Sequence, residues 1–321
     1  MTPPAHPLPV DPLAIPANGL LALFGPTAVG KTDVALALAE RLRAVGMRPV
    51  AVSADALQVY AGLETLTGVA RPAERARLEH RLVSFVPLDA TFSVGQYAGL
   101  AHAEIDELLA AGETPLVVGG TGLYLRAALA DLDLRPLPPD EVRERWEAEL
   151  VAGGPEALHE RLARRAPWAA AGIDPRDRHR LVRAHSLLDL GELEPPDGPS
   201  RLWTAETRHP TRLVGLIRDR DELYERIDAR VLAMVADGAV EQVRSAAAAG
   251  ASATARKALG FEELLCGDVA GMQRHTRNFA RRQLTWMRKL AGVELLDLTG
   301  RTAEQAADEL LARPAPATAA A

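Results

Sequence analysis

The chain has 321 residues, of which 48% are hydrophobic and 25% charged, and its net charge at pH 7 is −6. This composition is typical of a globular protein with a sizeable core and excludes a disordered chain. The length allows one large α/β domain with an insertion, or two domains. The acidic total weakly disfavours nucleic-acid binding, although a net charge hides local patches.

The sequence contains no signal for a membrane or for export. No apolar run reaches about 18 residues, and the N-terminus lacks the basic and apolar regions of a secretory signal. We therefore expect a cytoplasmic protein with no membrane contact. Cys266 is the single cysteine, which excludes an internal disulfide and a cysteine-based zinc site. We interpret Cys266 as a small packing residue.

The first half of the chain alternates between predicted strands and helices. Strands are predicted at residues 20–24, 48–53, 82–86 and 115–118, and helices at 33–43, 94–111 and 122–129. Such an alternation predicts an α/β fold in which helices flank a mainly parallel sheet.

The second half begins with a long helical region that interrupts the strand pattern. Residues 141–191 are rich in Arg, Glu and Ala and predict an all-helical insertion. The chain then predicts strands at 211–216 and 293–297, and helices at 221–235, 239–249, 271–290 and 302–312. The predicted domains are a flexible leader (1–17), a first core part (18–139), the helical insertion (140–200), a second core part with basic C-terminal helices (201–312) and a flexible tail (313–321).

A glycine-rich loop with the sequence GPTAVGKT occupies residues 25–32, between the first predicted strand and helix. Its two glycines allow backbone N–H groups to converge on an oxyanion, and the helix N-terminus adds partial positive charge. Lys31, one of only three lysines in the chain, can neutralise phosphate, and the Thr32 hydroxyl can bind Mg²⁺. This context predicts a phosphate site in a core like that of P-loop NTPases. The loop alone leaves open whether the phosphate belongs to a nucleotide.

Two further segments follow strands and should reach the same edge of the sheet. Asp55 comes after the second strand, where a carboxylate can bind Mg²⁺ through water or accept a proton. Its alternative role is that of a helix N-cap. The glycines around Thr121, in the sequence VVGGTGLY, permit a ligand to approach the backbone closely, although a tight turn alone would also explain them.

Two arginine-rich stretches, at residues 176–185 and 274–289, are conspicuous in an acidic chain. A solvated helix face is a sufficient explanation for any single arginine. Together, the two stretches suggest a polyanion held between the insertion and the core, with affinity that depends on salt.

With these motifs in this order, the chain resembles the tRNA dimethylallyltransferases, which prenylate an adenosine beside the anticodon. The resemblance covers nearly all of residues 20–298. The matching segments are GPTAVGKT (25–32), SAD through QVYAG (53–62), VGQY (94–97), PLVVGGTGLY (115–124), D through RLVRA (177–184), RIDAR (226–230) and TR through RRQLTW (276–286). GGTGLY and RQLTW are the specific elements, whereas the phosphate loop alone is not.

The resemblance implies transfer of a dimethylallyl group from dimethylallyl diphosphate to the exocyclic amine of adenosine, with release of pyrophosphate and with Mg²⁺ as cofactor. It implies Asp55 as general base, and Thr27 and Arg226 as further catalytic residues, with Arg226 as a second pyrophosphate clamp. The implied pyrophosphate site is Gly25, Pro26, Thr27, Ala28, Val29, Gly30, Lys31 and Thr32, and Thr32 is the implied metal ligand. We expect a monomer.

The resemblance also places a set of residues near the tRNA anticodon loop, from which the target base must be flipped out. These residues are Asp55, Ala56, Leu57, Gln58, Thr121, Arg143, His179, Arg180, Leu181, Val182, Arg183, Lys257, Ala258, Leu259, Gly260, Phe261 and Glu262.

Three segments depart from the family pattern. Ala56 stands where the family usually has Ser, TGVARP at 67–72 replaces a GTAKP segment, and KALGFE at 257–262 ends in Glu262 instead of a basic residue. These changes affect the expected tRNA contacts and leave the phosphate chemistry and Asp55 intact.

Three other functions remain compatible with parts of the chain. The first half alone fits a P-loop kinase of a small molecule, with the insertion as a lid. An enzyme that prenylates free adenine nucleotides would share the catalytic residues. A non-enzymatic RNA-binding module would leave the phosphate loop and Asp55 without a role.

Overall fold

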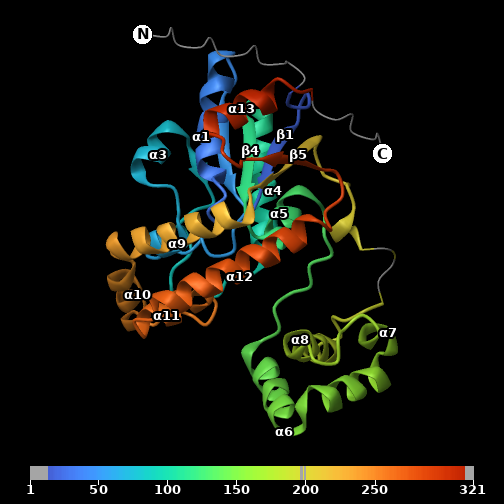
Figure 1. Ribbon diagram of the computed structural model, residues 1–321. Coiled ribbons are helices and arrows are strands. Elements are labelled where there is room, and N and C mark those ends of the chain that lie inside the picture. The colour runs from blue at the N-terminus through green and yellow to red at the C-terminus, as the bar shows by residue number, and fades with distance from the viewer. Residues whose placement is uncertain (1–13, 196–197, 199, 315–321) are drawn as a thin grey trace. The chain divides into compact units, whose positions relative to one another are not determined.

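The computed structural model describes residues 14–195, 198 and 200–314. The chain divides into two compact units, one made of Met1–Leu132 and Arg201–Ala321, and the other of Asp133–Ser200. We call the first the core unit and the second the helical unit. Figure 1 shows the chain traced through the core unit, out into the helical unit and back.

The core unit is built on one parallel sheet. Among the described residues, six strands pair in the order β3-β2-β4-β1-β5-β6. They are β1 (Leu20–Phe24), β2 (Pro49–Ser53), β3 (His80–Arg81), β4 (Thr114–Gly119), β5 (Thr211–Ile217) and β6 (Val293–Asp297). β1 lies inside the sheet, and all five of its residues are buried, which explains its continuous apolar sequence. The predicted α/β class with a P-loop-like core is confirmed.

Helices cover both faces of this sheet (Figure 1). α1 (Lys31–Ala44) packs with α13 (Ala303–Leu311) on one face, and α4 (Val94–Ala110) packs with α5 (Gly122–Leu129) on the other. This arrangement follows from right-handed crossovers, because the chain leaves β1 and β3 in opposite directions along the sheet. No helix within the described ranges has both the length and the apolar character needed to cross a membrane.

A layer of further helices extends the core unit beyond the sheet. It contains α9 (Arg220–Ala236), α10 (Ala239–Ala248), α11 (Phe261–Leu265) and α12 (Val269–Met287), together with the short α2 (Glu64–Thr67) and α3 (Pro72–Arg77). All of these helices except α3 contribute to one buried cluster, which includes Tyr60, Val231 and Phe261. This cluster fixes α9 and α12 beside the ends of the strands.

The helical unit consists of α6 (Asp140–Arg165), α7 (Pro167–Ala170) and α8 (Arg178–Asp189). α6 is kinked at Gly154, whose φ of 80° is not helical and which precedes Pro155. Trp146 is the centre of its core, since its ring stacks on His185 at 4.1 Å and its indole N–H donates to Asp189 at 2.8 Å.

The third predicted strand was wrong. Residues 82–86 were expected to be extended, but the strand is His80–Arg81, and only Val86 makes an isolated bridge, to Tyr60. Leu82 and Ser84 have φ values of 59° and 51°, which an extended strand does not allow.

Some expectations about single residues and the chain ends also need correction. Cys266 is exposed at the end of α11 and is therefore not a packing residue. Ala14 and Ile15 are buried in the main core, so the predicted flexible leader (1–17) is too long. Its residues 1–13, and residues 315–321 of the predicted tail, lie outside the described residues.

Gly122, the first residue of α5, faces the ring of Trp286 on α12. A Cβ atom added there would lie 2.2 Å from Trp286 Cε3, so we expect Gly122→Ala to lower the free energy of unfolding by about 1–3 kcal/mol. Urea unfolding followed by circular dichroism measures this change. Gly99→Ala is the control, because a Cβ atom added at Gly99, inside α4, would have no neighbouring atom within 4 Å. This variant should be as stable as the wild type or slightly more stable. Equal midpoints for the two variants would contradict the packing argument.

Candidate active site

A large cavity opens where the parallel strands end. Its volume is about 870 Å³, and it is bordered by the loop after β1, the segment after β2 and the turn after β4. Ligands of open parallel sheets bind at this edge. Side chains from α9 and α12 complete the cavity, whose lining includes Thr27, Lys31, Asp55, Thr121, Arg230 and Gln283.

The glycine-rich loop has the backbone conformation of a phosphate cradle. Gly30 has a φ of 111° and Ala28 a φ of 63°, and α1 begins at Lys31, so its first N–H groups point into the loop. Gly25 leaves little room for a side chain, since a Cβ atom there would lie 3.0 Å from Leu216 O and from a Val29 methyl group. Of the predicted loop residues, Thr27, Ala28, Gly30, Lys31 and Thr32 line the cavity, whereas Gly25, Pro26 and Val29 are buried and do not.

Lys31 is held inside this loop. Its Nζ donates hydrogen bonds of 2.9 Å to Gly25 O and to Pro26 O. Burial, and to a smaller extent the positive charge of Arg230, lower the pKa of Lys31 to about 7, while the negative charge of Asp55 acts in the opposite direction. The loop lysine is thus poised to gain a proton when an anion enters.

Asp55 lies on the cavity after β2. Its Oδ1 accepts from Leu57 N at 2.9 Å, and its Oδ2 accepts from the Thr121 hydroxyl at 3.5 Å. The following residues form turns and not a helix, so Oδ1 caps a turn instead of a helix. Oδ2 remains on the cavity side, beside the glycine turn that precedes α5.

Gln283 joins the two glycine-containing turns. Its Oε1 accepts from Thr27 N at 2.9 Å, and its Nε2 donates to Gly120 O at 2.8 Å. The side chain is buried, and its hydrogen bond to Gly120 O is buried with it. We did not predict Gln283 as a site residue, although the RQLTW motif that contains it was a signal.

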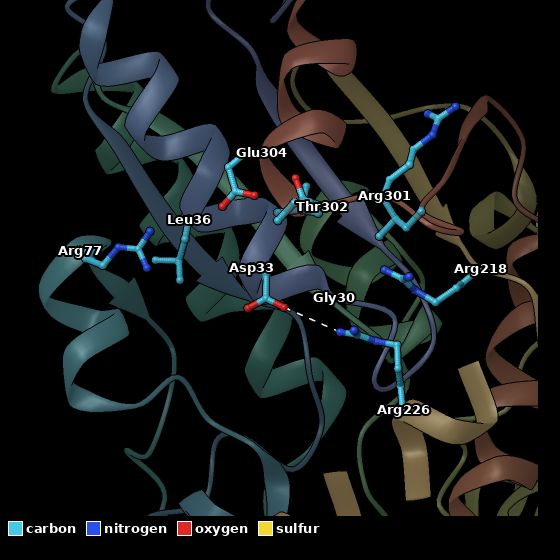
Figure 2. A pocket seen from close by; sticks show the side chains of 12 residues that line it. Gly30, Asp33, Leu36, Arg77, Arg218, Arg226, Arg301, Thr302 and Glu304 are labelled. Atoms are coloured by element: carbon cyan, nitrogen blue, oxygen red, sulfur yellow. Dashed lines mark ion pairs between the residues drawn. The ribbon is translucent and has the colours of Figure 1, made fainter. Parts of the chain in front are cut away.

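Arg226 does not line the large cavity. Its Nε donates to Ala28 O at 2.9 Å, and it lines a second pocket of about 280 Å³ on another side of the loop, shown in Figure 2. Arg230, one helical turn further along α9, lines the large cavity instead. A Cβ atom at Gly68 would lie 1.8 Å from Arg230 Nη2, so only glycine leaves space for this guanidinium.

The expected tRNA residues of the core unit fall into two groups. Asp55, Leu57, Gln58, Thr121, Lys257 and Leu259 line the cavity. Ala56 N lies 3.5 Å from the Thr121 hydroxyl. In contrast, Ala258, Gly260 and Phe261 are buried, and exposed Glu262 forms a two-bond pair with Arg256 at 3.0 and 3.1 Å. Because these three residues are buried, their side chains cannot contact the tRNA, although they can support neighbouring residues that do.

The expected tRNA residues of the helical unit show the same division. His179 and Arg180 are exposed at the start of α8, whereas Leu181 and Val182 are buried in the core of the unit. Arg143 pairs with Asp140 at 3.0 Å and Glu147 at 3.3 Å. Arg183 donates to Arg135 O at 2.7 Å, and burial lowers its pKa. Arg183 therefore contributes to the structure of the unit itself.

The fold and the cavity define the class of protein: a parallel α/β protein with a P-loop that faces a carboxylate across a large cavity. The chain matches the family described as IPP transferase over residues 58–290. The chain belongs to this family, which confirms the resemblance seen in the sequence.

Similar proteins match most of the length of the chain. A protein of Kineococcus radiotolerans named tRNA dimethylallyltransferase is 43% identical over 282 residues, which cover 84% of this chain and 88% of that one. A protein of the same name from Thermobifida fusca is 41% identical over 283 residues, with coverages of 84% and 87%.

Solved structures agree with this placement. A tRNA isopentenylpyrophosphate transferase from Bacillus halodurans has a TM-score of 0.66 and 30% identity, covering 92% of this chain and 95% of that one. A eukaryotic dimethylallyltransferase acting on tRNA has a TM-score of 0.70 at 21% identity, covering 87% and 74%. The second likeness is one of fold alone.

The lowered pKa of Lys31 predicts proton uptake on anion binding. Above about pH 7 the free lysine is largely neutral, and a bound diphosphate raises its pKa, so that the site takes up a proton at about pH 8. Titration calorimetry with inorganic diphosphate, in buffers of different ionisation enthalpy, counts these protons. Lys31→Met is the control and should take up fewer protons. Equal uptake by both proteins would contradict the assignment.

Proposed function

We propose that the protein transfers the dimethylallyl group of dimethylallyl diphosphate to the exocyclic amine of an adenosine beside the anticodon of tRNA. As a member of its family it is a prenyltransferase. The observation that carries the proposal is that Asp55 and the phosphate loop line one cavity. Its volume of about 870 Å³ is large enough for a diphosphate donor and a purine together.

In the proposed reaction, the phosphate loop on one side of the cavity binds the prenyl donor, and Asp55 on the other side faces the adenosine. The loop holds the diphosphate, and Asp55 accepts a proton from the adenine amine as its nitrogen attacks the first carbon of the prenyl group. The new carbon–nitrogen bond forms, the carbon–oxygen bond to the diphosphate breaks, and pyrophosphate leaves with the bonding electrons. Loop N–H groups and Lys31 stabilise the charge that develops on this leaving group.

We propose Arg230 as the second cation at the diphosphate, in place of Arg226. Arg230 lines the cavity, and the negative charge of Asp55 opposes the lowering of its pKa by burial. Arg230 therefore belongs to the same charged group as Lys31 and Asp55. A guanidinium in this position can bind two phosphate oxygens at once.

Mg²⁺ is the proposed cofactor. The described part of the chain has no group of three or more His, Cys, Asp or Glu side chains able to hold a metal ion, and Thr32 lines the cavity at the start of α1. Such a donor set fits Mg²⁺ that is bound mainly by substrate phosphates and water, with the Thr32 hydroxyl as a protein ligand. The metal would supply further neutralisation of the leaving charge.

We propose that exposed basic side chains of both units bind the tRNA. α12 carries Arg282 at the cavity, and Lys257 lies there as well. In the helical unit, Arg180 and His179 are exposed at the start of α8. Phosphate contacts of this kind provide affinity, and the cavity selects the base after it leaves the stack.

We propose that the protein acts as a monomer in the cytoplasm, where the tRNA substrate is found. One chain supplies the loop, Asp55, Arg230 and Gln283 to the same cavity. The proposed chemistry therefore needs no residue from a second copy.

The test of the function follows radiolabel from dimethylallyl diphosphate into undermodified tRNA, with free adenine nucleotides as the rival acceptor. A parallel reaction with ATP and nucleosides tests the kinase alternative. Label in the tRNA supports the proposal. Label only in free nucleotides, or phosphate transfer without prenyl transfer, would refute it.

Asp55→Asn should abolish prenyl transfer while tRNA affinity stays within about twofold, because the amide keeps the shape of the side chain but accepts no proton. Steady-state kinetics and filter binding measure the two quantities. Loss of tRNA binding in step with turnover would show that Asp55 does not act as the base.

Arg180→Ala should weaken tRNA binding and reduce the slope of log affinity against log salt by about one, as expected for one lost phosphate contact. Arg164→Ala is the matched control, since Arg164 is also exposed in the helical unit, on α6. The slope is measured by binding titrations at several salt concentrations. An unchanged slope for Arg180→Ala would place this side chain on the solvated surface.

A further inference from the structure

Two arginines hold the phosphate loop by its carbonyl groups. Arg226 Nε donates to Ala28 O at 2.9 Å, and Arg218 Nη2 donates to Val29 O at 3.4 Å. Both side chains line the smaller pocket of about 280 Å³ and not the large cavity. In Figure 2 they lie beside the loop near Gly30.

The direction of these carbonyls determines the direction of the loop N–H groups. In a trans peptide the C=O and the following N–H point to opposite sides. Holding Val29 O at Arg218 therefore turns the N–H of Gly30 away from that arginine. Ala28 has a φ of 63°, which is costly for a residue with a side chain. An interaction with its carbonyl helps to maintain this conformation.

Arg218 is the more firmly held of the two arginines. The Arg218 side chain is only 6% exposed and pairs with Glu222, whose Oε2 also accepts from Gly300 N at 3.2 Å. Arg226 Nη2 lies 3.9 Å from Asp33. The loop carbonyls are thus attached, through α9, to the segment after β6.

The N–H that follows the Ala28 carbonyl is that of Val29, which donates within the loop to Pro26 O at 3.3 Å. We propose that Arg226 and Arg218 are positioning residues: by holding the carbonyls of Ala28 and Val29, they keep the loop in the shape in which the Gly30 N–H is directed at the diphosphate. The inference rests on the proposed function, in which that diphosphate belongs to the prenyl donor. It differs from a direct contact, because neither arginine needs to touch the ligand.

The first experiment compares Arg226→Ala with Arg301→Ala. Arg301 lines the same pocket and pairs with Glu309, so its removal tests the effect of positive charge alone. Calorimetry should show that Arg226→Ala raises the dissociation constant of inorganic diphosphate about tenfold, as expected for a lost charged hydrogen bond. Arg301→Ala should change it less than about twofold, and tRNA affinity should not change in either variant.

Chemical rescue separates a positioning role from general damage to the fold. The vacated side-chain space joins the smaller pocket, so added guanidinium ion should restore much of the diphosphate affinity of Arg226→Ala and leave Arg301→Ala unaffected. Arg226→Lys keeps the charge but loses the planar donor. It should also bind diphosphate more weakly, which keeps the test available if Arg226→Ala does not fold.

Three results would overturn the inference: wild-type diphosphate affinity in both Arg226 variants, equal losses in Arg226→Ala and Arg301→Ala, or no rescue by guanidinium. Failure of the proposed function is a separate outcome. A wild-type protein that binds diphosphate but transfers no prenyl group to tRNA would refute the function, while the diphosphate affinities of the variants would still decide the role of Arg226.

Discussion

The phosphate loop must satisfy its own carbonyl groups without turning its N–H groups away from the cavity, and the rest of the site depends on this constraint. A buried polar group without a partner costs about 1–3 kcal/mol. Lys31 donates hydrogen bonds to the carbonyls of Gly25 and Pro26, and Arg226 donates one to the carbonyl of Ala28. The loop is therefore preorganised by side chains that come from both α1 and α9.

The sheet fixes the separation between Asp55 and the phosphate loop. β4 pairs with both β1 and β2, so the strands that carry the loop and Asp55 lie two strand spacings apart, about 10 Å. Gly119, at the end of β4, passes so close to Ala54 that a Cβ atom would lie 2.1 Å from the Ala54 oxygen. Strand geometry thus sets the positions of Asp55 and of the start of the phosphate loop.

The sequence was sufficient where a local pattern determines the structure. A buried apolar run located β1 to the residue. The strand predicted at 293–297 matches β6, although only Leu296 of its five residues is buried. The glycine-rich loop lies on the large cavity. The sequence was insufficient where tertiary contacts determine the position of a side chain or the course of the backbone. Arg226 and Arg230 are one helical turn apart, and only the packing of α9 distinguishes which of them reaches the cavity. The turn at Leu82 likewise depends on a backbone conformation that its apolar sequence does not signal.

The two hydrogen bonds of Gln283 have a thermodynamic consequence. Its neighbour Arg282 borders the same cavity on α12, where the RNA is proposed to bind, while Gln283 holds Thr27 N and Gly120 O. If the proposed RNA displaces α12, Gln283 transmits this movement to the loop that is proposed to bind the prenyl donor. The affinities for donor and acceptor are then linked, and linkage is reciprocal. If a bound nucleic acid increases the affinity for the prenyl donor, the donor must increase the affinity for the nucleic acid by the same factor.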